Sequence, residues 1–145
     1  MKIMVINGPN LNFLGKRDFS IYGEKTLEEI IAVIKLEGKK SGVDIIDFQS
    51  NCEGILIDFI QQHYMEANGI IINPGALTYY GLSLRDALHD TKLPIIEIHL
   101  SNIYNREEWR AKSVIAPISM GQIAGFGWRS YVAGLRILVE KLQEK

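Results

Sequence analysis

Five short apolar segments recur along the chain, separated by longer amphipathic ones. They are KIMVIN, VDIIDF, GIIIN, PIIEIHL and GQIAGF, at residues 2–7, 43–48, 69–73, 94–100 and 121–126. Apolar runs of this kind are typical of strands that are buried on both faces of a parallel sheet covered by helices. The last segment is the least clearly placed of the five. The pattern therefore predicts a buried five-stranded sheet.

The segments between these strands predict four helices, at about residues 26–42, 54–67 and 82–90 and from about residue 128 onward. In the first helix, Thr26 and Glu29 have the spacing of a capping box, and Gly42 suits the C-terminal stop. Apolar residues recur at helical spacing. They are Leu27, Ile30, Ile31 and Ile34 in the first helix and Tyr131, Val132, Leu135, Leu138, Val139 and Leu142 in the last. The second helix is expected to bury Ile55, Leu56, Phe59, Ile60 and Tyr64.

Repeated strand, helix, strand units imply right-handed crossovers and a doubly wound α/β sheet. With five strands we expect the flavodoxin-like order 2-1-3-4-5, in a single catalytic domain over residues 1–145. Ligands of such folds bind at the carboxyl ends of the strands, near the switch point between strands 1 and 3. The polar residues of the chain are concentrated at these ends, in residues 7–12, 49–53, 73–81 and 99–102.

The amino-acid composition and charge limit the kinds of molecule that the protein is expected to bind. The 145 residues are 47% hydrophobic, which is enough for one sizeable core. Lys and Arg number 16 against 17 Asp and Glu, with no segregated block of either sign. Such a chain lacks the electrostatic footprint that nucleic-acid or anionic-membrane binding needs. The expected partner is therefore a small molecule or a protein.

The cysteine content and the lengths of the apolar runs indicate in which cellular compartment the protein resides. Cys52 is the only cysteine, which excludes an intrachain disulfide and paired metal-binding motifs and fits a reducing cytoplasm. The first apolar stretch, of about four residues, is shorter than the apolar segment of a signal peptide. No run approaches the roughly 18 apolar residues of a membrane span. We therefore predict a cytoplasmic protein without a metal.

The connection NGPNLNFLGKRDFSIYG, residues 7–23, at first resembles a phosphate-binding loop. Such a loop requires GxxxxGK[ST], whose backbone N–H groups wrap the phosphates and whose hydroxyl holds magnesium. Here six residues separate Gly8 from Gly15, Pro9 removes one N–H donor, and Arg17 stands where the hydroxyl should be. The nearest approach to GxGxxG, GQIAGFG, lies late in the chain without an acidic partner about 20 residues on. Nucleotide binding is therefore disfavoured.

The same connection is long for a loop between a strand and a helix, and long loops of this kind are often lids or binding loops. A tyrosine can act as a base only where a positive neighbour favours its phenolate, and Arg17, which is always charged, could supply that field to Tyr22. The alternative is that Tyr22 anchors the loop by packing while Lys16 and Arg17 are solvated.

A second candidate pair lies in the fourth strand, where the alternation of side chains puts Glu97 and His99 on one face. A carboxylate in a buried strand is costly without a partner. Glu97 could orient the His99 ring and favour its protonated form, which poises a general acid. A structural ion pair is the alternative. A Ser–His–acid hydrolase is a weaker alternative because Ser101 lacks the GxSxG elbow. His63 and His89 are weaker candidates than His99 because neither lies at a strand end beside a carboxylate.

The chain closely resembles the type II 3-dehydroquinate dehydratases in four ordered motifs. These are NGPNLNFLGKRDFSIYG, FQSNCEG, INPGALTYYGLSLRDAL and EIHLSNIYNREEWRAKSVIAPISMGQIAGFG, and they run from the first strand to the last helix. The resemblance implies a flavodoxin-like fold and no cofactor. It also implies elimination of water from 3-dehydroquinate to give 3-dehydroshikimate in the shikimate pathway, by a homododecamer of trimers.

The resemblance also assigns the groups that carry out the elimination. Tyr22 matches the base that removes a C2 proton, and Arg17 matches the lid arginine that keeps the base ionised and stabilises the transition state. His99 matches the acid that protonates the departing C1 hydroxyl, with Glu97 orienting it. Asn10 matches the residue that helps to stabilise the enolate through a water. The elimination needs a base, a donor for the developing oxyanion and an acid. These three roles map onto three different strand ends.

The remaining matches concern substrate binding and assembly. Asn73, together with Leu100 and Ser101, matches the grip on the carboxylate and the C1 region. Arg110 matches the contact to the ring hydroxyls. Asp86 matches the residue that a neighbouring subunit contributes to the site.

The chain departs from the family pattern at two positions. Tyr79 stands where the family has a histidine that contacts the substrate hydroxyls, so we expect an altered grip on the ring while the elimination chemistry is kept. Cys52, where the family often has histidine, is expected to be a small buried filler. Tyr79 also motivates a rival hypothesis, that the chain is a catalytically impaired relative that binds a small carboxylate. A flavin or nucleotide carrier on the same fold is a further rival, which the loop spacing argues against.

Overall fold

A computed structural model describes residues 1–144 and contains a five-stranded parallel sheet in the order β2-β1-β3-β4-β5. The predicted flavodoxin-like order is confirmed. The strands are β1 (Lys2–Asn7), β2 (Asp44–Gln49), β3 (Gly69–Asn73), β4 (Ile95–His99) and β5 (Gly121–Ala124). Each lies within about a residue or two of its predicted segment. Because all strands run the same way, their carboxyl ends meet at one edge of the sheet.

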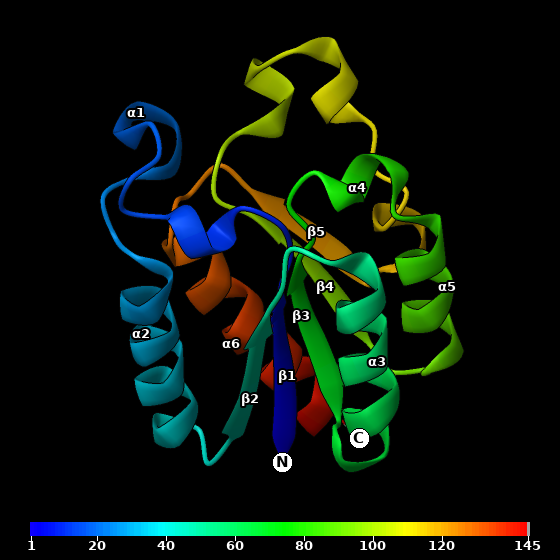
Figure 1. Ribbon diagram of the computed structural model, residues 1–145. Helices are drawn as coiled ribbons and strands as arrows, with labels where there is room; N and C mark the ends of the chain where they lie inside the picture. The colour runs from blue at the N-terminus through cyan, green and yellow to red at the C-terminus, as the bar shows by residue number, and fades with distance from the viewer. Residues whose placement is uncertain (145) are drawn as a thin grey trace.

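Helices cover both faces of the sheet (Figure 1). One face packs against α2 (Leu27–Lys40) and α6 (Arg129–Gln143), and the other packs against α3 (Glu53–His63) and α5 (Leu82–Asp90). Successive residues of β1 enter different cores, because side chains alternate across a strand: Ile3 and Val5 join the first and Met4 and Ile6 the second. Burial on both faces explains why the strands read as apolar runs.

Local signals account for the ends of the helices. The Thr26 side chain accepts a hydrogen bond from the Glu29 N–H at 3.2 Å, as the capping-box spacing predicts. Helix α2 ends at Lys40, and Gly42 turns the chain with a φ of 68°. Within residues 1–144, no helix has the length and apolarity that a membrane crossing needs.

The prediction that Ile55 is buried was wrong: 48% of the residue is exposed. Helix α3 directs Leu56 and Ile60, one turn apart, into the core, and Ile57 packs beside them. Ile55 lies at the edge of this face because the core covers only one stripe of the helix.

Short elements at the carboxyl edge of the sheet build the walls of a site. Helix α1 (Phe19–Tyr22) follows β1, and α4 (Leu77–Tyr80) follows β3. Two 3-10 turns, Ile103–Asn105 and Glu108–Ala111, follow β4. In Figure 1 α1 and the yellow segment that carries these turns stand above the strand ends. The apolar periodicity did not predict these elements, since each is only three or four residues long.

The loops after β1 and β3 touch each other, and glycine makes the contact feasible. A Cβ on Gly8 would lie 2.2 Å from the Pro74 carbonyl oxygen. Gly75 has a φ of 58°, and a Cβ there would lie 2.8 Å from the Pro9 carbonyl oxygen. The Gly8 N–H also donates to the Asn73 carbonyl at 2.8 Å. Glycine therefore holds together the two loops at the switch point of the sheet.

Candidate active site

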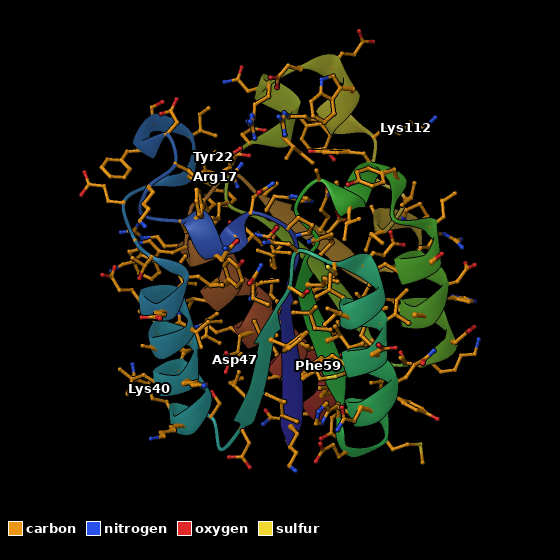
Figure 2. All side chains as sticks on the ribbon, in the orientation of Figure 1. Arg17, Tyr22, Lys40, Asp47, Phe59 and Lys112 are labelled. Atoms are coloured by element: carbon orange, nitrogen blue, oxygen red, sulfur yellow. The ribbon has the colours of Figure 1, made fainter. Side chains whose placement is uncertain are left out.

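A cavity of about 150 Å³ opens at the carboxyl edge of the sheet. The connection of residues 7–23, which we call the lid, contributes Asn10, Arg17 and Tyr22 to its wall. Figure 2 shows Arg17 and Tyr22 together above the strand ends. The other predicted residues that line the cavity are Asn73, Tyr79, His99, Leu100, Ser101 and Arg110. Nine of the eleven predicted site residues therefore meet in one place, as the topology requires.

Arg17 and Tyr22 form a close pair within the lid. Arg17 Nη2 donates a hydrogen bond to the Tyr22 hydroxyl oxygen at 2.8 Å, and Arg17 Cζ lies 3.7 Å from the centre of the Tyr22 ring. A capped turn brings them together: the Asp18 carboxylate accepts from the Ser20 N–H at 2.9 Å. The Ser20 hydroxyl donates to the same oxygen at 2.6 Å, and these two hydrogen bonds lower the pKa of Asp18. Gly23, with a φ of 79°, then ends α1 directly after Tyr22.

A second arginine that sequence reasoning missed also faces Tyr22. Arg106 lines the cavity, and its Cζ lies 5.2 Å from the centre of the Tyr22 ring. Its Nη1 donates to the Ser101 Oγ at 3.2 Å. Two guanidinium groups thus lie close to the ring of one phenol. The signal was present in NREEWR, where Arg106 follows the same strand end as Ser101.

Glu97 and His99 form the predicted pair on one face of β4. His99 Nε2 lies 2.7 Å from Glu97 Oε1, with Glu97 fully buried and His99 5% exposed. Glu97 does not line the cavity and lies behind His99. Because Nε2 is engaged by the carboxylate, Nδ1 is the nitrogen that can exchange a proton with a ligand.

Two hydroxyls also contact Glu97. The Thr78 hydroxyl donates to Glu97 Oε1, and the Ser113 Oγ lies 2.9 Å from both carboxylate oxygens. Burial by itself raises the pKa of Glu97, but the hydrogen bonds from His99, Thr78 and Ser113 outweigh it and hold the pKa below its ordinary value. The carboxylate is therefore ionised at neutral pH. Sequence reasoning missed both hydroxyls, which come from other segments of the chain.

Asn73 is held in place by a buried tyrosine that sequence reasoning assigned only to the core. Tyr131 is fully buried in α6. Its hydroxyl donates to the Asn7 Oδ1 at 2.6 Å and accepts from the Asn73 Nδ2 at 2.9 Å. The Asn73 Oδ1 accepts from the Gly75 N–H at 3.2 Å. Both ends of the Asn73 amide are thus bonded to the protein, and its orientation is set.

Asn10 occupies the base of the lid in a left-handed conformation with a φ of 68°. Its backbone N–H donates to the Asn51 Oδ1 at 3.0 Å, and the Gln49 Nε2 donates to the same oxygen at 3.1 Å. Asparagine tolerates this conformation better than most residues. Gln49, which ends β2, and Asn51, which follows it, therefore position Asn10 although neither lines the cavity.

Tyr79 belongs to an aromatic wall on the far side of the cavity. Its ring meets the Trp109 ring edge to face, with centroids 5.0 Å apart, and Arg110 Cζ lies 4.1 Å from the centre of Trp109. Burial raises the pKa of the Tyr79 phenol, and the nearby Arg110 offsets only part of this rise. Tyr79 is therefore a neutral phenol at physiological pH. Arg110 is itself held by Glu107, which accepts from its Nε at 2.6 Å.

Besides Glu97, two residues named from the sequence lie outside the cavity. Asp86 is exposed on α5 and does not line it. Cys52 is exposed, so the prediction of a buried filler was wrong. It is the N-cap residue of α3, and such a position at the start of a surface helix leaves the side chain in solvent. Among residues 1–144, no group of three or more His, Cys, Asp and Glu is arranged to hold a metal ion.

Comparison with known proteins decides the family. The family model described as "Dehydroquinase class II" matches residues 1–139. The chain belongs to the class II dehydroquinase family. The resemblance inferred from the four sequence motifs is thereby confirmed.

Relatives of this class II dehydroquinase are similar over nearly its whole length. A protein of Roseiflexus castenholzii named "3-dehydroquinate dehydratase" is 57% identical over 139 residues, which cover 96% of this chain and 88% of the relative. A protein of Clostridium acetobutylicum with the same name is 50% identical, with coverage of 99% and 100%. One of Thermotoga maritima, also so named, is 46% identical with coverage of 99% of both chains.

Two solved structures that superimpose on this chain are type II dehydroquinases as well. The type II dehydroquinase of Butyrivibrio crossotus superimposes with a TM-score of 0.92 at 45% identity, covering 95% of this chain and 97% of its own. The type II dehydroquinase of Propionibacterium acnes gives a TM-score of 0.91 at 37% identity, with coverage of 96% of both chains. The chain thus shares both sequence and fold with its family.

Proposed function

We propose that this chain is a 3-dehydroquinate dehydratase, a hydro-lyase that eliminates water from 3-dehydroquinate to give 3-dehydroshikimate. The reaction belongs to the shikimate pathway, which leads to the aromatic amino acids. One observation carries the proposal: a single cavity in a class II dehydroquinase is bordered by the Arg17–Tyr22 pair and by His99 backed by Glu97. The first pair suits a base and the second suits an acid, which are the two groups that an elimination needs.

Tyr22 is the base in this proposal. Its phenolate takes a proton from C2, next to the ketone, and the electron pair of the broken C–H bond moves into an enolate. Two cations support this role. Arg17 donates a hydrogen bond to the phenol oxygen at 2.8 Å, and Arg106 Cζ lies 5.2 Å from the ring centre. Both stabilise negative charge as it passes from the phenolate to the enolate.

Asn10 assists the enolate through a bridging water. Its support is its place on the cavity wall and the hydrogen bond from its backbone N–H to Asn51, which fixes it there. With the backbone held in this way, the side-chain amide of Asn10 can orient a water toward a developing oxyanion.

His99 is the acid that completes the elimination. As the enolate collapses, the C1–O bond breaks, and the proton on Nδ1 passes to the departing hydroxyl to form water. Glu97 supports this role because its carboxylate, 2.7 Å from Nε2, stabilises the imidazolium and fixes the orientation of the ring. The enolate electron pair forms the new double bond, so no cofactor is needed.

The rest of the cavity wall binds the substrate. Asn73 and Ser101, with the backbone at Leu100 and Ser101, grip the carboxylate and the C1 region. Tyr79 and Arg110 lie on the side proposed for the ring hydroxyls. Support comes from their shared presence in the cavity wall and from the Tyr131 hydroxyl, which orients the Asn73 amide. Arginine side chains also suit a substrate that carries a carboxylate.

We further propose that the enzyme is a cytoplasmic homododecamer of trimers in which Asp86 reaches the site of a neighbouring subunit. Asp86 is exposed on α5 and does not line the cavity of its own chain. Tyr80 and Leu82, at the adjoining helix ends, are 62% and 61% exposed, and such apolar side chains favour coverage by another subunit. Analytical ultracentrifugation gives the assembly state. A monomer with full activity would refute this assignment for Asp86.

An ultraviolet assay tests the function directly, because 3-dehydroshikimate contains a conjugated enone and 3-dehydroquinate does not. Purified protein is expected to raise the absorbance when 3-dehydroquinate is added. Calorimetry with the same substrate provides the second measurement. Binding without any absorbance change would favour the rival hypothesis of a carboxylate-binding protein, and a flavin spectrum in the purified protein would favour a carrier.

A further inference from the structure

The buried carboxylate of Glu97 is surrounded by more donors than an ion pair with His99 requires. We propose that Thr78 and Ser113 are positioning residues that keep Glu97 in its carboxylate form and thereby keep His99 in its imidazolium form, the stronger acid. The inference rests on the proposed function for its catalytic consequence. Its structural basis is independent of that function, since it concerns where one proton resides within the protein.

The geometry defines which atoms donate. Oε1 of Glu97 accepts from the Thr78 hydroxyl and lies 2.7 Å from His99 Nε2. Ser113 Oγ lies 2.9 Å from each carboxylate oxygen, so its single proton can be shared between them. Both oxygens of the carboxylate therefore have donors from outside β4.

The Ser113 hydroxyl is itself oriented by the backbone. The N–H groups of Ile115 and Ala116 donate to Ser113 Oγ at 3.0 and 2.9 Å. Two incoming N–H donors occupy the acceptor capacity of the oxygen, so its own proton is directed to an acceptor. Glu97 is the charged acceptor in contact with it. A chain of hydrogen bonds thus runs from the turn at residues 115–116 through Ser113 to Glu97.

These donors decide between two arrangements of one proton. In the first, Glu97 is a carboxylate and His99 is an imidazolium, which carries protons on both ring nitrogens. In the second, the Nε2 proton has moved to the carboxylate and His99 is a neutral imidazole. The ring then still carries its Nδ1 proton, but a neutral imidazole is a much weaker acid toward the leaving hydroxyl than an imidazolium. A carboxylate at 0% exposure is costly without donors, and each hydroxyl bonded to it favours the first arrangement. Loss of the hydroxyls therefore weakens the acid although His99 itself is unchanged.

Matched substitutions remove the hydroxyls with little change in shape. Thr78→Val replaces the hydroxyl with a methyl group, Thr78→Ser keeps the hydroxyl, and Ser113→Ala removes the second donor. The control is Thr91→Val, which removes a part-buried hydroxyl that donates to the Leu88 carbonyl at the end of α5. We expect kcat to fall about 10- to 100-fold in Thr78→Val and in Ser113→Ala, with KM within about threefold. Thr78→Ser should restore most of kcat, and Thr91→Val should retain it.

Nitrogen NMR of the histidine ring supplies a readout that a purely structural role would not change. The chain has three histidines, so a His99→Asn variant assigns the His99 signals. At the pH of maximal turnover, the unmodified protein should show both His99 nitrogens protonated. Thr78→Val and Ser113→Ala should shift these signals toward neutral imidazole, and folding of each variant is checked by circular dichroism.

The outcomes separate this inference from the proposed function. Retained kcat in a folded Thr78→Val or Ser113→Ala variant would overturn the inference, and so would a loss of kcat with unchanged His99 signals. If Thr78→Val fails to fold, Ser113→Ala and Thr78→Ser still decide. If the unmodified protein has no activity, the proposed function fails, whereas the NMR comparison still tests whether the hydroxyls hold the proton on His99.

Discussion

Arg17 and Tyr22 are joined in two ways, by a hydrogen bond of 2.8 Å between Nη2 and the phenol oxygen and by a cation–π contact in which Arg17 Cζ lies 3.7 Å from the ring centre. The cation–π contact holds the guanidinium over the ring, and the hydrogen bond directs one of its N–H groups at the oxygen. Lysine has neither the planar shape nor the paired donors, so the two cations are not interchangeable here.

Substitution of either residue of the pair is expected to lower the turnover of 3-dehydroquinate. Tyr22→Phe should lower kcat by about a hundredfold to ten-thousandfold, because a general base contributes roughly that much. Arg17→Lys should lower kcat less, since a charge remains without its geometry. The control is Tyr104→Phe, which removes an exposed hydroxyl bonded to Gln122. Substantial activity in Tyr22→Phe would refute its role as the base.

The ionised state of Glu97 should appear in the pH dependence of stability. The folded-state pKa of Glu97 is lowered, so its contribution to stability is present above its ordinary pKa of 4.5 and is lost as the pH falls through the lowered folded value. Glu97→Gln should therefore be about 2 kcal/mol less stable than the unmodified protein at pH 7. Below a pH of about 4 the gap should narrow. Urea unfolding at several pH values measures it, and a gap independent of pH would contradict the assignment.

The Tyr131 hydroxyl should contribute to both stability and substrate binding. Tyr131→Phe leaves the buried Asn7 and Asn73 side chains without their shared partner. The expected cost is about 1–3 kcal/mol in the free energy of unfolding, by chemical denaturation. KM should rise several-fold because the Asn73 amide then keeps only the hydrogen bond from the Gly75 N–H and is less firmly oriented, while kcat changes little. Tyr104→Phe is again the control, and an unchanged KM would show that Tyr131 does not position Asn73.

Tyr79 should bind the substrate as a neutral hydrogen-bonding group. Since burial raises the pKa of the phenol, its charge does not change between pH 6 and pH 8, and its contribution to KM should stay constant over that range. A Tyr79→His variant should show a KM that changes near a pH of about 6.5, where imidazole titrates. Tyr79→Phe should raise KM. If Tyr79→Phe leaves KM unchanged, the phenol does not contact the substrate.

The architecture of this protein was predictable from local sequence pattern. Apolar runs predicted all five strands, and the alternating helices implied crossovers that led to the order 2-1-3-4-5. Errors occurred where burial depends on what lies opposite a residue. Ile55 is at the edge of the face that α3 turns to the core, and Cys52 lies at an exposed helix start. Neither position is decided by apolar periodicity alone.

The contacts of the candidate site also fall into those that the sequence predicts and those that it does not. Glu97 and His99 are two residues apart in one strand, and Arg17 and Tyr22 share one loop, so their proximity follows from the sequence itself. Other contacts join segments far apart in the chain, such as Thr78 and Ser113 with Glu97, and Tyr131 with Asn7. Whether such groups meet is settled by how helices and loops pack on the sheet. Local pattern was therefore enough for the fold and for these two pairs. The buried donors that hold the pairs in place depend on how distant segments pack, because a buried polar group must find its partner through packing.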